Sequence, residues 1–181
     1  MLLTRDRSLL LVIDVQPRLL AAMIERETVV ARTAILMRAA RRLGVPLLVT
    51  EHYRHGLGTT VPALAELATP GETIEKLHFN CAAEPAVQAQ LALMKPRRQA
   101  VLCGIEAHVC VLQSALGLQA AGWDVAVVAD ATSTRHAHDL DHGLRRLAAA
   151  GVSIVTSEMV VFEWLGRAAT PEFRDLLALI K

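Results

Sequence analysis

Residues 101–113, VLCGIEAHVCVLQ, join an apolar run to a glycine, a polar break and a cysteine. An apolar run stops at Gly104, and after a short polar break an apolar-periodic segment begins at Cys110 and continues to Gly122. This pattern predicts a buried strand, a sharp turn and a helix with a thiol in or beside its first turn. A helix N-terminus lowers the pKa of a cysteine and stabilises its nucleophilic thiolate. The alternative for Cys110 is a small buried hydrophobic residue.

The composition is typical of one globular domain, and we expect that domain to span residues 1–181. The chain is 53% hydrophobic, no apolar run reaches the ~18–20 residues of a membrane span, and the N-terminal apolar run ends in Asp14 instead of a small-residue cleavage site. A formal net charge of +1 lacks the basic footprint of a nucleic-acid binder. Three cysteines without CxxC spacing fit a reducing compartment. We therefore expect a cytoplasmic protein that binds neither nucleic acids nor membranes.

Strand and helix patterns alternate along the chain, which predicts an α/β fold. The first strand, 9–13, is apolar throughout, as strands buried on both faces of a parallel sheet are. The other expected strands are 46–50, 73–76, 99–105, 124–129 and 152–155. The expected helices lie near 29–43, 62–67, 84–94, 110–121, 136–150, 159–165 and from 171 onward, with a helical first turn at Pro17. We predict three αβα layers with a six-stranded, mainly parallel sheet.

Polar residues follow several expected strands at their carboxyl ends, where open α/β sheets bind ligands. Asp14 follows the first strand, the loop 51–60 (EHYRHGLGTT) the second, and a loop at 131–134 the fifth. We expect the loop 51–60 to contact substrate. A dinucleotide-binding dehydrogenase is disfavoured, because no GxGxxG follows the first strand.

Three ionisable residues, Asp14, Lys76 and Cys110, stand near the ends of different expected strands. Together they would form a nucleophile set, in which the carboxylate takes the thiol proton and the ammonium stabilises both anions. Singly, each has a structural explanation: a turn former or helix cap, a solvated surface charge, and a small core residue.

Several motifs resemble those of the isochorismatase-like cysteine hydrolases, a superfamily that includes nicotinamidases, N-carbamoylsarcosine amidohydrolases and ureidoacrylate hydrolases. They are LLVIDVQ at 10–16, Lys76 shortly before Phe79, GIEAHVC at 104–110 and VLQSAL at 111–116. The isochorismatase-domain-containing subgroup is more similar still, through PLLVTEHY at 46–53, GLGTTVPAL at 56–64, VADATSTR at 128–135 and TSEMVVFEWLG at 156–166. The resemblance extends from residue 9 to about residue 180 and implies the Rossmann-like topology of that superfamily.

The resemblance implies a role for each residue of the trio: Asp14 as general base, Lys76 as the lysine of the triad, and Cys110 as nucleophile. It also implies a cis peptide bond between Ile105 and Glu106, and an oxyanion hole made by the backbone N–H groups of Glu106 and Cys110. The implied reaction is hydrolysis of an amide-like C–N bond of a small molecule through a thioester. A retained Cys110 favours this acyl chemistry over vinyl-ether hydrolysis of isochorismate.

The loops near the trio supply the candidates for the substrate pocket. These are Gln16, Glu51, Tyr53, Phe79, Cys81 and Ile105. Nicotinamidases often bind a metal through an Asp-x-His pair, whereas the matching residues here are Glu51, His52 and Tyr53. We therefore expect no metal and no other cofactor. Cys81 has a structural alternative as filler, and His108 would face either the pocket or a neighbouring subunit.

The resemblance also implies a homo-oligomer, a dimer or larger, in which Trp123 and Trp164 would form either a subunit contact or part of the core. We assign Cys103 to the core. Two other functions stay open. One is a catalytically idle binding or scaffolding protein, and the other is a thiol redox sensor in which Cys81 or Cys103 resolves an oxidised Cys110.

Overall fold

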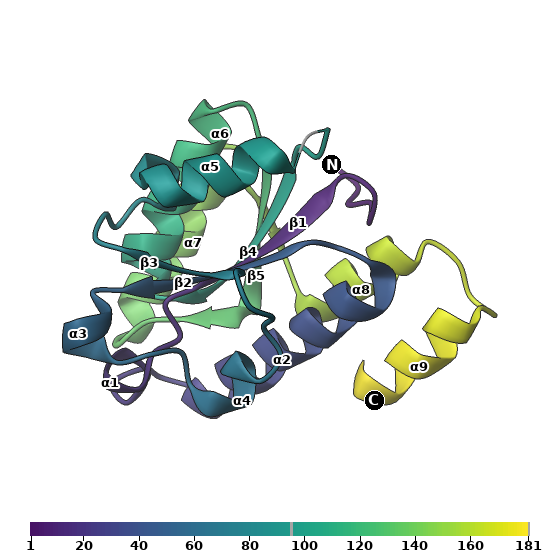
Figure 1. The fold of residues 1–181 in the computed structure, drawn as a ribbon, viewed down its shortest axis with the longest axis horizontal. Coiled ribbons are helices and arrows are strands. Elements are labelled where there is room, and N and C mark those ends of the chain that lie inside the picture. The colour runs from purple at the N-terminus through teal and green to yellow at the C-terminus, as the bar shows by residue number, and fades with distance from the viewer. Residues whose placement is uncertain (95, 181) are drawn as a thin grey trace.

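One six-stranded sheet runs through the centre of the protein (Figure 1). The computed structural model describes residues 1–94 and 96–180, so Lys95 and Lys181, the last residue of the predicted domain, lie outside the described residues. The sheet order is β3-β2-β1-β4-β5-β6, and every neighbouring pair is parallel. The strands are β1 (Ser8–Ile13), β2 (Leu47–His52), β3 (Thr73–Lys76), β4 (Gln99–Ile105), β5 (Asp124–Ser133) and β6 (Ser153–Val155). The predicted fold class is confirmed.

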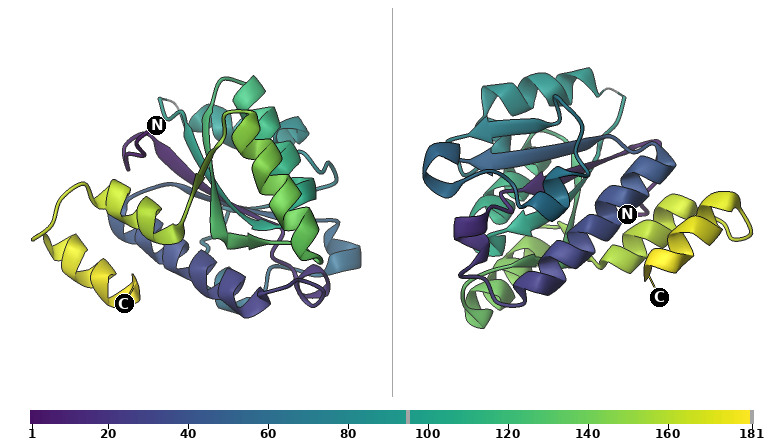
Figure 2. Two further views of the ribbon diagram at one scale, coloured as in Figure 1. Left: turned by 180° about the vertical axis from the view of Figure 1, so that it is seen from behind. Right: turned by 60° about the horizontal axis from the view of Figure 1, so that its bottom comes forward.

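Helices cover both faces of the sheet, because successive residues of each buried strand point to opposite sides. Leu10 and Val12 of β1 pack on one side, and Leu9 and Leu11 on the other. The first side is covered by α2 (Arg26–Leu43), α4 (Pro62–Ala65), α8 (Ser157–Leu165) and α9 (Pro171–Ile180). The second side is covered by α5 (Pro85–Leu93), α6 (Leu112–Ala120) and α7 (Ala137–Ala149), as the two views of Figure 2 show.

The strand order reverses beside β1. The chain proceeds from β1 outward to β3, then returns to the other side of β1 for β4 and continues to β6. Open α/β sheets bind ligands at the carboxyl ends of the strands where this reversal occurs. Asp14 directly follows β1, and Glu106 directly follows β4.

Gly104 allows β1 and β4 to approach each other closely where the strand order reverses. It pairs with Ile13, and a Cβ at this position would lie 2.1 Å from the carbonyl oxygen of Ile13. Its φ of +113° is also one that residues with side chains rarely adopt. A glycine is therefore required for both reasons.

Two predicted loops are partly strand in the structure. β2 continues to His52, because Glu51 and His52 pair with Glu75 and Lys76 of β3, and the rest of the loop 51–60 contains the short helix α3 (Arg54–Leu57). The predicted loop 131–134 is wrong for its first three residues, since β5 continues to Ser133 after a register shift opposite β4. Polar composition suggested loops at both places, but pairing partners from distant segments extend the strands.

The helix after the central strand begins differently from the prediction. Residues Ala107–Val111 form a π-helical turn, η2, and the α-helix α6 begins only at Leu112. The short helix α1 (Pro17–Leu20) begins at Pro17 as predicted, whereas α2 begins three residues before the predicted start. Helix α8 is capped at its N-terminus, because the Thr156 side chain accepts a hydrogen bond from the Met159 N–H.

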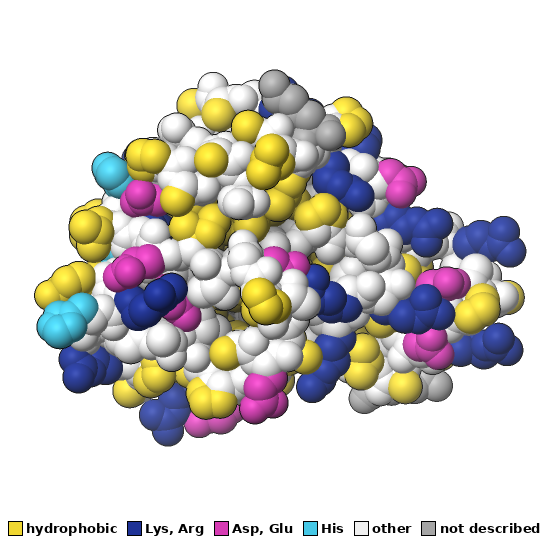
Figure 3. All heavy atoms as spheres, viewed as in Figure 1, with side chains coloured by type: hydrophobic (Ala, Val, Ile, Leu, Met, Phe, Trp, Pro, Cys, Tyr) yellow, Lys and Arg dark blue, Asp and Glu magenta, His cyan; other side chains and the backbone are white. Residues whose placement is uncertain are grey.

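The surface in Figure 3 carries basic and acidic side chains interspersed over the same face. Both tryptophans, Trp123 and Trp164, are buried in the two layers of the core, as is Cys103. Among the described helices, none combines the length and the apolar character that crossing a membrane requires.

Candidate active site

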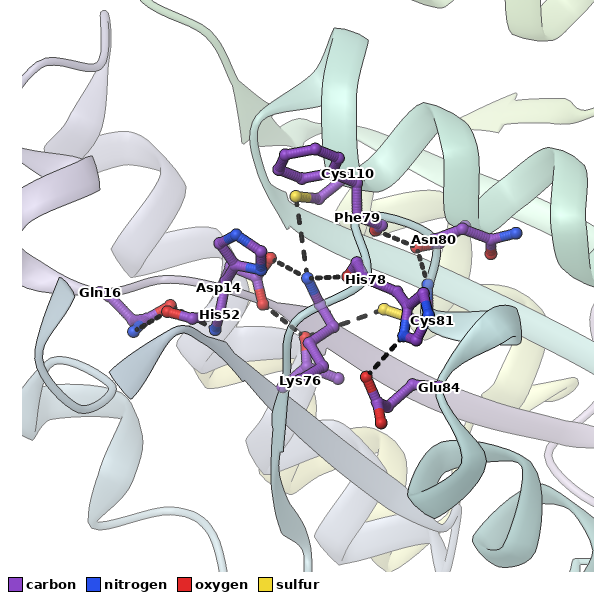
Figure 4. A network of polar contacts seen from close by, with 12 residues as sticks. Asp14, Gln16, His52, Lys76, His78, Phe79, Asn80, Cys81, Glu84 and Cys110 are labelled. Atoms are coloured by element: carbon purple, nitrogen blue, oxygen red, sulfur yellow. Dashed lines mark hydrogen bonds and ion pairs between the residues drawn. The ribbon is translucent and has the colours of Figure 1, made fainter. Parts of the chain in front are cut away.

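Asp14, Lys76 and Cys110 meet at the carboxyl end of the sheet (Figure 4). Lys76 Nζ lies 2.6 Å from Asp14 Oδ2 and 3.8 Å from Cys110 Sγ. Asp14 follows β1, Lys76 ends β3, and Cys110 lies in η2 after β4. Their exposed fractions are 0%, 1% and 6%, so the cluster is almost closed to bulk solvent. The structure therefore brings the predicted trio into contact.

The Asp14 carboxylate is held on both oxygens. Thr50 Oγ1 donates to Asp14 Oδ1 at 2.7 Å, and Lys76 Nζ donates to Oδ2. The Asp14 backbone N–H also donates to the Thr50 carbonyl oxygen at 3.1 Å. A buried ionised carboxylate is stable only when it is paired and hydrogen-bonded in this way.

The Lys76 ammonium has three partners within the site. Besides the carboxylate and the thiol, it donates to the carbonyl oxygen of His78 at 3.1 Å. Burial lowers the pKa of Lys76, but the adjacent Asp14 carboxylate raises it, and the result lies above the ordinary value. The lysine therefore remains a cation at neutral pH.

Cys110 differs from the prediction of a thiolate at a helix start. Burial, and next the adjacent Asp14 carboxylate, raise the pKa of the Cys110 thiol far above its ordinary value, and the Lys76 ammonium offsets this only in part. The helix N-terminus stabilises a thiolate that water reaches, whereas this sulfur is buried next to an anion. The resting thiol is therefore protonated, with a carboxylate beside it that can accept its proton.

The segment before η2 is anchored to the end of β5. The Ile105–Glu106 peptide bond is cis, at the position that the family resemblance implies. The Glu106 carboxylate pairs with Arg135 Nε at 3.0 Å. The Ile105 side chain, a pocket candidate, is fully buried in a small cluster with Met23 and Val29.

Gln16 and Glu51, two of the pocket candidates, are occupied within the fold. Gln16 accepts from the His52 N–H at 2.7 Å, and its amide nitrogen donates to the carbonyl oxygens of His52 and Gly58. Glu51 Oε1 accepts from the N–H and the hydroxyl of Thr60. These contacts leave Gln16 and Glu51 to shape the loop 51–60 instead of pointing into the pocket.

Tyr53 and Phe79, the two aromatic candidates, lie at the surface, each about half exposed. The Phe79 ring packs against the His52 ring with centroids 5.1 Å apart, and Figure 4 shows this pair beside Cys110 and Asp14. Burial and the nearby Lys76 lower the pKa of His52, which keeps its imidazole neutral. Sequence reasoning left His52 undecided, and its place next to Lys76 in the β2–β3 register is what brings it to the site.

Cys81, the remaining candidate, is fully buried behind the trio. Its N–H donates to Ser114 Oγ at 2.9 Å, and its Sγ lies 3.9 Å from Thr50 Oγ1. Burial raises the pKa of Cys81 to about 11, so it is a neutral thiol. Thr50 and Ser114 were missed by sequence reasoning, since one lies inside an expected strand and the other inside an expected helix.

The residues at the end of β2 do not fit the metal site of nicotinamidases. The Glu51 carboxylate is engaged by Thr60 and Arg54, and Tyr53 is half exposed. Within residues 1–94 and 96–180, no three His, Cys, Asp or Glu side chains converge as metal ligands would.

Comparison with known proteins identifies the family. Residues 8–159 match the isochorismatase domain. The chain belongs to the isochorismatase family. This confirms the resemblance in the sequence motifs and supports a hydrolase of the cysteine-hydrolase fold.

Relatives of this isochorismatase-family protein match over most of their length. The secreted isochorismatase effector Isc1 of Phytophthora sojae is 36% identical over 178 residues, which cover 96% of this chain and 84% of the relative. Isochorismatase domain-containing protein 2 of Bos taurus is 37% identical over 175 residues, covering 96% and 83%. The solved structure described as the MAR1 ribonuclease of Caenorhabditis elegans superposes with a TM-score of 0.92 at 33% identity, covering 99% of this chain and 92% of that chain.

Proposed function

We propose that this isochorismatase-family protein hydrolyses an amide-like C–N bond of a small molecule through a thioester on Cys110. The observation that carries this proposal is the buried cluster in which Lys76 Nζ lies 2.6 Å from the Asp14 carboxylate and 3.8 Å from the Cys110 sulfur. A nucleophile beside a base that a third group orients is the recurring arrangement of covalent catalysis. The one substrate atom required is an electrophilic carbonyl carbon.

The first step is attack on the carbonyl. As a bond forms between Cys110 Sγ and the carbonyl carbon, the thiol proton passes to the Asp14 carboxylate, and the carbonyl π electrons move to oxygen. The raised pKa of Cys110 is compatible with this step, because the proton leaves only as the sulfur attacks. The backbone N–H groups of Glu106 and Cys110 would stabilise the oxyanion, each by roughly 3 kcal/mol.

The second step releases the amine. Asp14 returns the proton to the leaving nitrogen, the C–N bond breaks, and a thioester remains on Cys110. Water then attacks the thioester while Asp14 accepts a proton from it. The C–S bond breaks to release the carboxylic acid, and the proton passes from Asp14 to Cys110 Sγ to restore the thiol. The Lys76 cation neutralises Asp14 in the resting state and keeps the carboxylate available as a base.

The competing redox function is disfavoured by the state of the other thiols. Cys81 and Cys103 are fully buried, and burial raises the pKa of Cys81 to about 11 and that of Cys103 to about 12. A resolving cysteine needs an accessible thiolate, which neither residue offers at neutral pH. A catalytically idle scaffold would have no need for a buried ion pair beside a thiol.

We infer further that the protein works in the cytoplasm as a homo-oligomer. Three free thiols fit a reducing compartment, and Leu77 and Leu93 are large apolar side chains that are more than half exposed. Light scattering coupled to size exclusion would give the mass, and a monomer at micromolar concentration would contradict the oligomer.

Mass spectrometry of the intact protein during turnover tests the proposed function. On a panel of small amides, we expect an acyl adduct on Cys110 in the wild type and in Cys103→Ala, and none in Cys110→Ala. Hydrolysis that persists in Cys110→Ala would exclude a thioester. Absence of adduct and turnover across the panel, together with a reversible disulfide under mild peroxide, would instead favour the redox function.

A further inference from the structure

Thr50 contacts Asp14 through both its backbone and its side chain. Its carbonyl oxygen accepts the Asp14 N–H at 3.1 Å, and its hydroxyl donates to Asp14 Oδ1 at 2.7 Å. Both residues are fully buried, so no water competes for these groups. Two contacts from one residue fix the position of the Asp14 backbone and the rotation of its carboxylate together.

The direction of the Thr50 hydroxyl is determined by its neighbours. An ionised carboxylate paired with Lys76 can only accept hydrogen bonds, so the Thr50 hydrogen points to Asp14. The lone pairs of Thr50 Oγ1 then face Cys81, whose Sγ is 3.9 Å away and which is a protonated thiol. The backbone N–H of Cys81 is in turn held by Ser114 of α6. A buried chain of donors thus runs from Cys81 through Thr50 to Asp14.

We propose that Thr50 is a positioning residue for the general base, holding Asp14 Oδ1 so that the carboxylate keeps one orientation between Lys76 and Cys110. This inference rests on the proposed function, in which Asp14 takes the thiol proton. Lys76 donates to Oδ2, whereas Thr50 donates to Oδ1. Without the hydroxyl, Oδ1 would be a buried acceptor lacking that donor, and the carboxylate would take up a proton more readily.

The reaction of Cys110 with iodoacetamide reports on this proton transfer without knowledge of the substrate. Sγ forms a bond to the methylene carbon, iodide leaves, and the thiol proton passes to Asp14. Peptide mass spectrometry separates Cys110 from the other two cysteines. The rate is measured against pH in the wild type, Thr50→Val, Thr50→Ser and the control Thr33→Val, which alters a buried threonine of α2 outside the site.

We expect the acid limb of the Cys110 rate profile to lie about one pH unit higher in Thr50→Val, since one hydrogen bond to a charged group has about that effect. Thr50→Ser keeps the hydroxyl and should restore the limb, and Thr33→Val should leave it unchanged. Thr50→Ala also lacks the hydroxyl but does not add the methyl group that valine puts in its place. The acid limb of its rate profile should shift in the same direction. Thermal melting of each variant identifies the folded ones.

Two results would overturn the inference while leaving the proposed function intact. One is an identical acid limb in Thr50→Val or Thr50→Ala and the wild type. The other is a change in the alkylation rate of Cys110 on Thr50→Val that is equally large when Asp14 is already replaced by asparagine. That result would show that Thr50 acts through some other group. If Asp14→Asn leaves the alkylation rate of Cys110 unchanged from the wild type, Asp14 is not the base, and the proposed role of Thr50 fails with it.

Discussion

The Lys76 ammonium and the Asp14 carboxylate form an ion pair of 2.6 Å in which neither side chain is exposed, although 62 residues separate them in the chain. Removing one partner leaves an uncompensated buried charge, which costs about 3–5 kcal/mol. We therefore expect Lys76→Met to lower the free energy of unfolding by about 3–5 kcal/mol. Urea unfolding followed by circular dichroism measures it.

The double variant Asp14→Asn with Lys76→Met separates charge from packing. It should recover part of the lost stability, because no charge is then left buried, while hydrolysis stays abolished. Arg145→Met, which breaks an exposed pair with Asp141, is the matched control and should cost less than about 1 kcal/mol. A cost for Lys76→Met as small as for Arg145→Met would contradict the buried pair.

Gly104 should tolerate alanine much less well than Gly44. Both have positive φ, but a Cβ at Gly104 would lie 2.1 Å from the Ile13 carbonyl oxygen, whereas a Cβ at Gly44 meets nothing within 4 Å. Gly44→Ala should lower the free energy of unfolding by about 1 kcal/mol, because alanine disfavours the positive φ. Gly104→Ala should cost several times more and displace β4 from β1. Equal melting temperatures for the two variants would contradict the close approach of the strands.

Much of the fold followed from local patterns, because apolar runs and helix stops are local signals. β4 begins and ends at the predicted residues, α2 ends at the predicted residue 43, and α7 ends one residue before the predicted residue 150. The ends of β2 and β5 were wrong, since Glu51 and Thr132 are polar and are strand residues only because distant partners pair with them.

The residues of the trio could be proposed from sequence, but their surroundings could not. No spacing rule places Thr50 beside Asp14 or Gln16 against His52, because these contacts depend on strand register. The protonation state of Cys110 was also beyond sequence reasoning. A helix N-terminus lowers the pKa of a thiol, whereas burial beside a carboxylate raises it. In Cys110 burial is the larger effect, so its pKa is raised.

Gln16 should matter for the loop 51–60 more than for the chemistry itself. Its amide holds the His52 N–H, the His52 carbonyl and the Gly58 carbonyl. Gln16→Leu leaves these partly buried groups without their partner. We therefore expect the free energy of unfolding to fall by about 1–3 kcal/mol and amide exchange to be faster at residues 52–58. Gln16→Glu keeps the acceptor for the His52 N–H and should protect that amide better than leucine does. Unchanged exchange in Gln16→Leu would show that the loop is held by other contacts.

Cys103 should make the protein less stable in alkali. Its thiol is fully buried in the core, and burial raises its pKa from the ordinary 9.0 to about 12. Below pH 9 both the folded and the unfolded chain keep the proton, so the contribution to stability is complete. Between pH 9 and 12 the unfolded chain ionises while the folded chain does not, and stability falls by about 1.4 kcal/mol per pH unit for this group. Cys103→Ala should therefore be less stable at pH 7, because of the cavity, but should lose stability less steeply above pH 9.

Val101→Ala, a truncation in the same buried strand that removes no titrating group, should lower stability without changing the slope. Denaturant unfolding at several pH values from 7 to 11 measures both slopes, and parallel curves for Cys103→Ala and the wild type would contradict the raised pKa.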